Sequence, residues 1–310
     1  MNRDTFFGVI FALLAALGFS AKAILIKLAY LDHVDAISLL ALRMAFAVPF
    51  FIAVAIWLNT HEHHPLERRD WFAVVILGLL GYYLSSFLDF LGLLYISAGL
   101  ERLILFLYPT MTVILSAIIY KRTISRKTLL AMALSYAGIV LVFLHDVNNS
   151  QAQFDLNQSE ILLGAGFVFA SALSYSSYLV GAGHAIKRMG ATRFTAYASI
   201  VASIASLLQF LLTHPMTSLN LSAKVYELSL AMAVFSTVLP VFLLSYAIRR
   251  IGSSSTSLIG SIGPVVTIGL AYVFLNETLS ALQILGTVLV MAGVLMISLN
   301  SKKVDEKAAT

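Results

Sequence analysis

The sequence predicts an all-α membrane protein with ten transmembrane helices, arranged as two inverted five-helix repeats with both termini in the cytoplasm. Three observations support this: an apolar composition, ten apolar segments of membrane-spanning length, and a likeness between the two halves of the chain. Of its 310 residues, 60% are hydrophobic and only 11% are charged, whereas a soluble domain carries about 25% charged residues. So few polar residues cannot cover a soluble globule, which excludes a soluble enzyme, a disordered chain and a nucleic-acid-binding protein.

Membrane-spanning helices need about 20 mostly apolar residues to cross the hydrocarbon core of a bilayer. The fifth predicted span is short, and each of the first three contains a charged residue. The longest connector, residues 145–160, is polar and is predicted to be a loop. The chain has no cysteine, so disulfides and thiolate metal sites are excluded. The predicted spans are 6–26, 36–57, 71–94, 100–119, 128–144, 161–181, 194–213, 227–247, 254–275 and 281–299.

Lysine and arginine are concentrated in alternate connectors, and this bias sets the orientation. If the N-terminus is cytoplasmic, 15 of the 20 basic residues lie in cytoplasmic segments, three lie in outer loops, and Lys22 and Arg43 lie within spans. Short cytoplasmic loops of membrane proteins carry such an excess. The pattern therefore predicts a cytoplasmic N-terminus and C-terminus, and it explains the net charge of +5 without a nucleic-acid partner.

The two halves of the chain are similar in sequence. A shift of 155 residues aligns Pro109 with Pro264, and near the start a shift of 158 aligns Gly8 with Gly166. Each copy has five spans, and because five is odd the second copy enters the membrane from the opposite side. Inverted repeats suit alternating access to a site near the middle of the bilayer. The predicted organisation is a first repeat (1–145), an outer connecting loop (146–160), a second repeat (161–300) and a cytoplasmic tail (301–310).

Three of the prolines inside predicted spans are candidate kink positions. Pro109 and Pro264 lie mid-span at matching places, and Pro240 lies in the eighth span. A proline inside a helix removes a backbone hydrogen bond, and paired interruptions in matching helices point to a transporter's binding region. The alternative, a kink that serves packing alone, stays open. The hydroxyl-rich run 252–257 predicts a helix start, because hydroxyl groups cap free backbone amides.

The second copy resembles the EamA-type family of the drug/metabolite transporter superfamily. The first copy departs from the pattern, with Lys121 and Arg122 where the family often has an acidic residue and Lys127 where glutamine is usual. The resemblance implies export, rather than import, of an amino acid, vitamin, nucleoside or drug-like compound, with spans one to four and six to nine around the centre. The residues that carry it are Pro264, Val265, Glu277, Ser280, Gln283, Gly286, Gly293 and Val294.

Lys22, Arg43 and Asp89 are predicted to lie at similar depth in the outer half of the membrane. A buried charge costs roughly 2.5–3.5 kcal/mol on insertion scales, so each needs a partner or a role. One interpretation is a packing network in which Asp89 neutralises Arg43 or Lys22, although Lys22 could also extend to the outer surface. The other is a functional site, in which a spare positive charge binds a substrate carboxylate or phosphate, or Asp89 exchanges protons. Glu101 is expected at a solvated helix end, with a gate or an ion pair as alternatives.

Polar and aromatic side chains form helical faces that could line a central cavity. Facing tyrosines would suit an aromatic or amphipathic substrate, whereas hydroxyl bonds between helices are the plainer alternative. The resemblance also implies an arginine at the position of Arg43. The candidate substrate-binding or coupling residues are Lys22, Arg43, Asp89, Tyr82, Ser86, Tyr175, Tyr178 and Thr237.

Features of a membrane-embedded enzyme are not apparent in the sequence. An aspartyl protease needs two intramembrane carboxylates, and the sequence predicts only one, Asp89. The histidine-rich segment 61–65 has the wrong spacing for a metalloprotease motif. We therefore expect no catalytic residue, cofactor or metal. A non-transporting scaffold is the other alternative, and it would need a longer interaction tail. We expect a secondary carrier of a small organic metabolite in a bacterial inner membrane, with lipid around it, protons as a candidate coupling ion, and no nucleic-acid partner. The sequence leaves the oligomeric state open.

Overall fold

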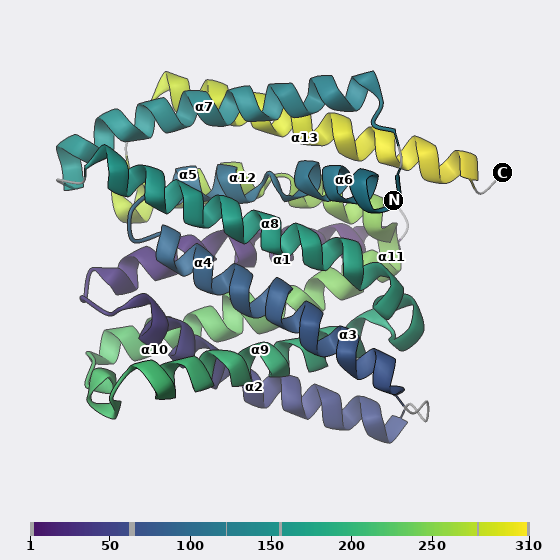
Figure 1. Ribbon diagram of the computed structural model, residues 1–310, viewed down its shortest axis with the longest axis horizontal. Helices are drawn as coiled ribbons and strands as arrows, with labels where there is room; N and C mark the ends of the chain where they lie inside the picture. Colours follow the sequence, from purple (N-terminus) through teal and green to yellow (C-terminus); the bar gives the residue numbers. More distant parts are fainter. Residues whose placement is uncertain (1–2, 62–65, 122, 155–156, 278, 309–310) are drawn as a thin grey trace.

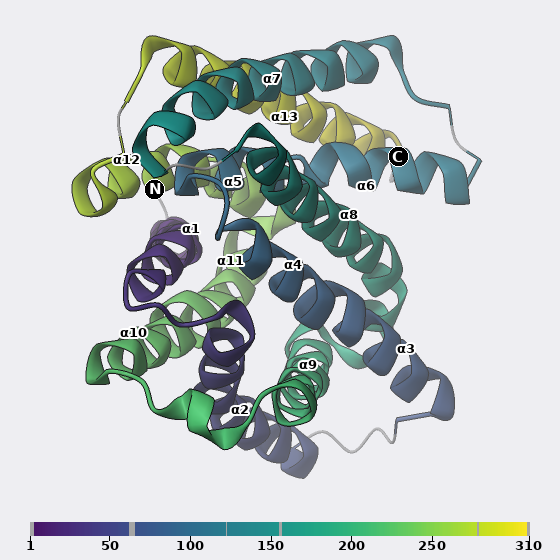
Figure 2. The ribbon, with the colours of Figure 1, turned by 60° about the vertical axis from the view of Figure 1, so that its left-hand side comes forward.

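The computed structural model describes residues 3–61, 66–121, 123–154, 157–277 and 279–308 as a helical bundle without β-strands in these ranges. Figure 1 and Figure 2 show α7 and α13 along one side, α2, α9 and α10 along the opposite side, and α1 and α8 between them. The helices are α1 (Arg3–Tyr30), α2 (Ala36–His61), α3 (Arg68–Gly78), η1 (Leu79–Leu84), α4 (Ser85–Gly92), α5 (Ala98–Leu105), α6 (Tyr108–Ile119), α7 (Arg126–Phe154), α8 (Gln158–Met189), α9 (Ala191–Thr213), η2 (Met216–Leu219), α10 (Ala223–Ala233), η3 (Val234–Val238), α11 (Leu239–Gly260), α12 (Gly263–Leu275) and α13 (Ala281–Ala308).

Eight helical stretches in the described ranges are long and apolar enough to cross a membrane. Two shorter apolar helices, Gly263–Leu275 and Ala281–Met296, lie within the ninth and tenth predicted spans, and the first part of the ninth predicted span, 254–260, belongs to α11 instead. Three of the eight stretches are built from consecutive elements, because α3, η1 and α4 form one, α5 and α6 another, and α10, η3 and most of α11 a third. The all-helical prediction is confirmed.

Three segments predicted to be connectors or helix starts differ in the structure. The backbone of the predicted loop 146–160 is helical through Phe154 and again from Gln158, and α13 continues through most of the predicted tail to Ala308. Residues 252–257 lie inside α11, so the predicted helix start there is wrong. None of these segments contains a proline. Extending an existing helix is far easier than nucleating a new one, and mid-helix hydroxyl groups can bond to the preceding turn instead of capping.

The two copies are interrupted at matching places, next to Pro109 and Pro264. The first break separates α5 from α6, and the second, at the equivalent position of the other copy, separates α11 from α12. Each proline is the second residue of the helix after the break, where its missing amide costs no helical hydrogen bond. The prolines therefore begin new helices instead of bending continuous ones.

Serine hydroxyl groups reach these breaks from the first helix of each copy. Each hydroxyl group bonds at 2.7 Å to the carbonyl four residues earlier in its own helix and also reaches one break. Ser20 Oγ in α1 lies 3.1 Å from the carbonyl oxygen of Gly263, and Ser176 Oγ in α8 lies 3.0 Å from that of Tyr108. Each acceptor is the residue just before a proline. Since the positions of the two serines, 20 and 176, differ by 156, α1 corresponds to α8 with a shift of 156.

This register corrects the shift of 158 that the sequence predicts for α1 and α8. A Cβ built on Gly8 would lie 2.5 Å from Ile251, and one built on Gly164 would lie 3.1 Å from Ile96. The two isoleucines align at the shift of 155, so Gly8 corresponds to Gly164 and not to Gly166. Short runs of glycine, alanine and phenylalanine align almost equally well at several shifts, and only the contacts across the bundle distinguish them.

Wider π-helical turns also occur at matching places, because the first residues of η1 and η3 align at the shift of 155. Ser174 Oγ donates to the carbonyl of Leu80 in η1 at 2.8 Å. The equivalent carbonyl, that of Phe235 in η3, faces Gly18, where an added Cβ would lie 2.5 Å from the oxygen. Pro240 is the second residue after η3, but position 85 in the first copy is a serine. A proline is therefore not required for this turn, and π-turns of this kind are frequent at functional sites.

Contacts between helices run mainly from one copy to the other. α1 packs against α10, α11 and α12, while α8 packs against α3, α4, α5 and α6. α2 packs against α9, and α7 packs against α13. Exchanging the copies leaves this pattern essentially unchanged, as a two-fold relation between them requires.

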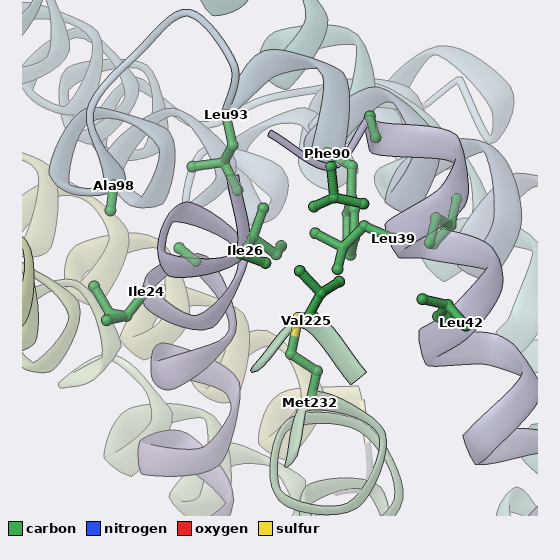
Figure 3. Close-up of a cluster of buried hydrophobic side chains, with 14 of the residues drawn as sticks. Ile24, Ile26, Leu39, Leu42, Phe90, Leu93, Ala98, Val225 and Met232 are labelled. Atoms are coloured by element: carbon green, nitrogen blue, oxygen red, sulfur yellow. The ribbon is translucent and has the colours of Figure 1, made fainter. Parts of the chain in front are cut away.

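An apolar cluster joins the first copy to α10 of the second (Figure 3). It contains Ile26 from α1, Leu39 from α2, Phe90 from α4, and Val225 and Met232 from α10, all fully or almost fully buried. Burying one such side chain contributes about 1.5–3 kcal/mol. This packing fixes α1, α2 and α4 relative to one another, and these three helices carry the predicted intramembrane charges.

We predict that Gly286→Ala destabilises the protein. Gly286 in α13 faces Gly138 in α7, and a Cβ built on either would lie 2.5 Å from the other's carbonyl oxygen. Forcing the two backbones apart should lower the free energy of unfolding by about 1–3 kcal/mol. Gly166→Ala is the control, because nothing lies within 4 Å of the Cβ built there. Thermal unfolding in detergent measures both, and equal midpoints would contradict the prediction.

Candidate functional site

An ion pair between α1 and α4 lies inside the bundle. Lys22 Nζ donates to Asp89 Oδ2 at 2.5 Å, and the Asp89 side chain is 1% exposed. Removing the cation from a buried carboxylate is strongly destabilising, because it leaves a charge without solvent or partner. The structure therefore brings together two of the three predicted intramembrane charges, and Lys22 points to Asp89 instead of to the outer surface.

Arg43 in α2 completes this charge cluster but is bound differently. Its Nη2 group donates to Ser86 Oγ at 3.1 Å, and its guanidinium carbon stands 5.0 Å from the ring centre of Phe90. Ser86, Asp89 and Phe90 share one face of α4, because residues three and four apart are neighbours on a helix. Arg43 is 4% exposed, and its Nε atom has no hydrogen-bond partner in the described part of the chain. Its direct contacts are thus with neutral groups, while Asp89 acts on its charge electrostatically without a salt bridge in the described ranges.

Glu101 in α5 does not lie at the solvated helix end that its sequence position predicts. It is 0% exposed, so the expected solvated helix end is not observed. Neither carboxylate oxygen accepts a hydrogen bond from a donor group in the described ranges. Asp89, Lys22 and Arg102 all lie close enough to act on it electrostatically. The candidate site therefore contains a second intramembrane carboxyl group, which α5 brings to the Lys22–Asp89 pair.

Glu277, from the segment after α12, reaches across to the first copy. Its Oε1 accepts from the backbone amide of Ala98 at 2.8 Å and its Oε2 from that of Gly99 at 3.3 Å. These amides begin α5, where free N–H groups and the helix dipole favour an anion. Glu277 therefore holds the N-terminus of α5 in place, and with it Glu101.

A second cluster consists of aromatic rings between η1, α6, α8 and α9. Tyr82 and Tyr178 share a hydrogen bond of 3.1 Å between their hydroxyl groups. Tyr175 lies 5.5 Å from Tyr178 and 5.2 Å from Tyr108, measured between ring centres. Phe194 stacks on Tyr178 at 6.1 Å. The structure thus brings together all three predicted tyrosines and adds Tyr108, which the sequence analysis missed.

Thr237 lies in η3 and Pro240 shortly after it, where η3 packs against α1. The Thr237 hydroxyl donates to the carbonyl of Met232 within its own helical segment, at 3.0 Å. The Pro240 ring faces Gly18, where an added Cβ would lie 2.5 Å from Pro240 Cγ. Neither contact identifies a ligand-binding role for these two residues. The histidine-rich segment 61–65 falls largely outside the described residues.

Salt bridges between the copies lie at both ends of the bundle. At the end predicted to be cytoplasmic, Arg188 of α8 pairs with Asp70 of α3 at 2.7 Å. At the other end, Lys224 of α10 pairs with Asp32, after α1, at 2.8 Å. Segments that the charge bias assigns to the same side of the membrane are therefore in contact.

We predict that Lys22→Met destabilises the protein far more than Lys224→Met. The first variant leaves Asp89 buried without its cation, which costs roughly 3–5 kcal/mol. The second removes an exposed ion pair, which is worth at most about 1 kcal/mol. The double variant Lys22→Met, Asp89→Leu should recover most of the loss, since the unpaired carboxylate is removed with its cation. Thermal unfolding midpoints test this, and similar losses for both lysines would contradict it.

Comparison with known proteins assigns the family. The uncharacterized transporter YcbK of Bacillus subtilis is 30% identical over 290 residues, covering 92% of this chain and 90% of that protein. The uncharacterized transporter sll1319 of Synechocystis is 25% identical over 330 residues, covering 98% and 96%. A solved crystal structure matches with a TM-score of 0.65 at 18% identity, covering 96% and 98% of the two chains, which shows the fold alone. The model of the EamA-like transporter family matches residues 6–144 and 162–299, so the chain belongs to this family and is an integral, multi-pass membrane protein.

Proposed function

We propose that the protein is a secondary carrier of a small organic metabolite, with ten membrane-spanning helices in two inverted five-helix repeats. The observation that carries this proposal is the reciprocal packing of the copies around a buried cluster of charges. Two halves that contact each other through equivalent surfaces can rock between two equivalent arrangements, as alternating access requires. A rigid scaffold or a membrane enzyme has no evident need of this symmetry.

The proposed orientation places both termini in the cytoplasm. In support, the start of α1 and the end of α13 lie at the same end of the bundle, on the right in Figure 1, as an even number of crossings requires. The salt bridges at the two ends join segments that the charge bias assigns to the same side. Opening either side would break one of these salt bridges and leave the other intact.

The proposed substrate carries a carboxylate or phosphate group. Lys22 and Asp89 neutralise each other, whereas Arg43 is held by a hydroxyl group and an aromatic ring. One positive charge is thus left for an anionic group, which Arg43 would bind with Ser86 as its neighbour. The rings of Tyr82, Tyr175 and Tyr178 would contact an apolar or aromatic part. Export is the direction that the family resemblance favours, with proton antiport, exchange or facilitated diffusion as the driving process.

The absence of native cysteine allows a sharp test of the inverted topology. Ser125 and Ser280 are equivalent positions at the shift of 155, just before α7 and α13. We predict that a membrane-impermeant maleimide labels Ser280→Cys in intact cells, and labels Ser125→Cys only after permeabilisation. Thr217→Cys, in the predicted outer connector before α10, is the control for outside labelling. Labelling of both serine positions from the same side would refute the inverted arrangement.

Transport should occur in liposomes without ATP. The screen would cover labelled amino acids, nucleosides, vitamins and sugar phosphates, and each anionic hit would be compared with its neutral amide or ester. Because a hydrogen bond to a charged group is worth about 1.5–3 kcal/mol, Arg43→Ala should reduce uptake of the anion about 10- to 100-fold more than uptake of the neutral analogue.

The control for this test is Arg250→Ala, since Arg250 is exposed and lies over the ring of Phe11 at 5.3 Å. This variant should transport both compounds as well as the unmodified protein does. Equal losses of both compounds in Arg43→Ala would assign Arg43 to packing. Uptake that depends on ATP, or no uptake of any compound, would refute the secondary carrier.

A further inference from the structure

Glu101 and Asp89 present two carboxyl groups to each other inside the bundle, on neighbouring elements of the first copy. The two residues are 0% and 1% exposed, and their carboxyl groups lie within hydrogen-bonding reach of each other. Asp89 Oδ2 is occupied by Lys22. Asp89 Oδ1 and both Glu101 oxygens have no donor group facing them in the described part of the chain. Two ionised carboxylates in this position would repel each other without solvent to screen them.

The surrounding cations do not remove this repulsion. Lys22 is already bonded to Asp89, and Arg43 donates to Ser86. Arg102 follows Glu101 in α5, but no hydrogen bond or salt bridge joins their side chains within the described ranges. Glu277 is bound to the amides of Ala98 and Gly99 and brings a further negative charge to the same helix end. The charged and titratable groups close enough to act electrostatically on the pair are Lys22 and Tyr30 from α1, Arg43 from α2 and Arg102 from α5.

A single proton satisfies this arrangement. Protonated at one oxygen, Glu101 becomes a donor, and its O–H can reach the free Oδ1 of Asp89. Asp89 then accepts from Glu101 on one oxygen and from Lys22 on the other, so that the buried groups gain partners and only one negative charge remains. An ionised Glu101 without a donor would instead leave a buried charge uncompensated, which costs several kcal/mol.

We propose that Glu101 and Asp89 form a proton-binding pair, in which Glu101 carries the transported proton and Asp89 accepts its hydrogen bond. This inference rests on the proposed carrier function, for which it supplies the coupling ion. In the structure the proton is enclosed. It is released when α1 and α5 move apart and water reaches Glu101, because water then solvates both carboxylates. A neutral Glu101 also leaves the positive charge of Arg43 available for an anionic substrate.

Infrared spectroscopy of the purified full-length protein tests the pair without any substrate. A protonated carboxylic acid has a C=O band, distinct from the carboxylate bands, that shifts in D2O. We expect this band at neutral pH in the unmodified protein, its loss in Glu101→Gln, and its persistence in Glu227→Gln, a matched change at an exposed glutamate in α10. Glutamine is a neutral isostere of protonated glutamate, so Glu101→Gln should keep its unfolding midpoint.

Two results would overturn the proton-binding pair. One is the absence of a carboxylic acid band at neutral pH in the unmodified protein, which needs no variant to be folded. The other is a band that Glu101→Gln leaves unchanged. The carrier proposal is tested by a separate result. A protein that shows the band but moves none of the screened metabolites would refute transport alone, and a protein that transports without the band would refute the proton pair alone.

Discussion

Lipid offers no hydrogen bonds and no counter-ions, so each polar side chain inside this bundle must find its partner in the protein. Many of these partners lie in the other copy. Ser20 and Ser176 bind carbonyls at the opposite helix breaks, Ser171 bonds to Ser85, and Glu277 holds the amides of α5. These contacts tie the two copies to each other, although the hydroxyl groups of Ser20 and Ser176 also bond to the carbonyl four residues earlier in their own helices. The same constraint explains why the few charges cluster instead of being scattered.

The interruptions in the helices follow a related logic. Breaks before Pro109 and Pro264 and wide turns at η1 and η3 occur at matching places in both copies. A break or wide turn leaves backbone carbonyl groups without their usual helical partner. The first helix of the other copy donates a serine hydroxyl group to such a carbonyl, or leaves room for it with a glycine. Irregular backbone inside a membrane is tolerated only where protein or a water-filled cavity surrounds it. At these four places the irregular backbone is therefore enclosed by the other copy.

Backbone symmetry contrasts with chemical asymmetry. In the register of 156, Lys22 of α1 corresponds to Tyr178 of α8, so a charge in one copy stands where an aromatic ring stands in the other. Asp89 corresponds to Leu244 in the register of 155. The ion pair and Glu101 belong to the first copy, while the second supplies Tyr175, Tyr178 and Phe194 of the ring cluster. In the proposed carrier, the symmetric backbone would allow the two halves to rock, and the charge cluster and the ring cluster would contact different parts of the substrate.

Composition, periodicity and the placement of lysine and arginine determined the helical class, the membrane environment, the repeated halves and the choice of Lys22, Arg43 and Asp89, because these features depend on residues near each other in the chain or on counts. Tertiary structure alone decided which charges meet, that Glu101 is buried beside Asp89, that Glu277 caps α5, and that α1 corresponds to α8 with a shift of 156. Residues 252–257 are a further example, because their run of serines predicts a helix start, whereas α11 continues through them. Whether a side chain is buried, and which side chain it binds, depends on segments far apart in the chain, and the local sequence does not indicate either. Lys22 and Asp89, for example, are separated by 67 residues.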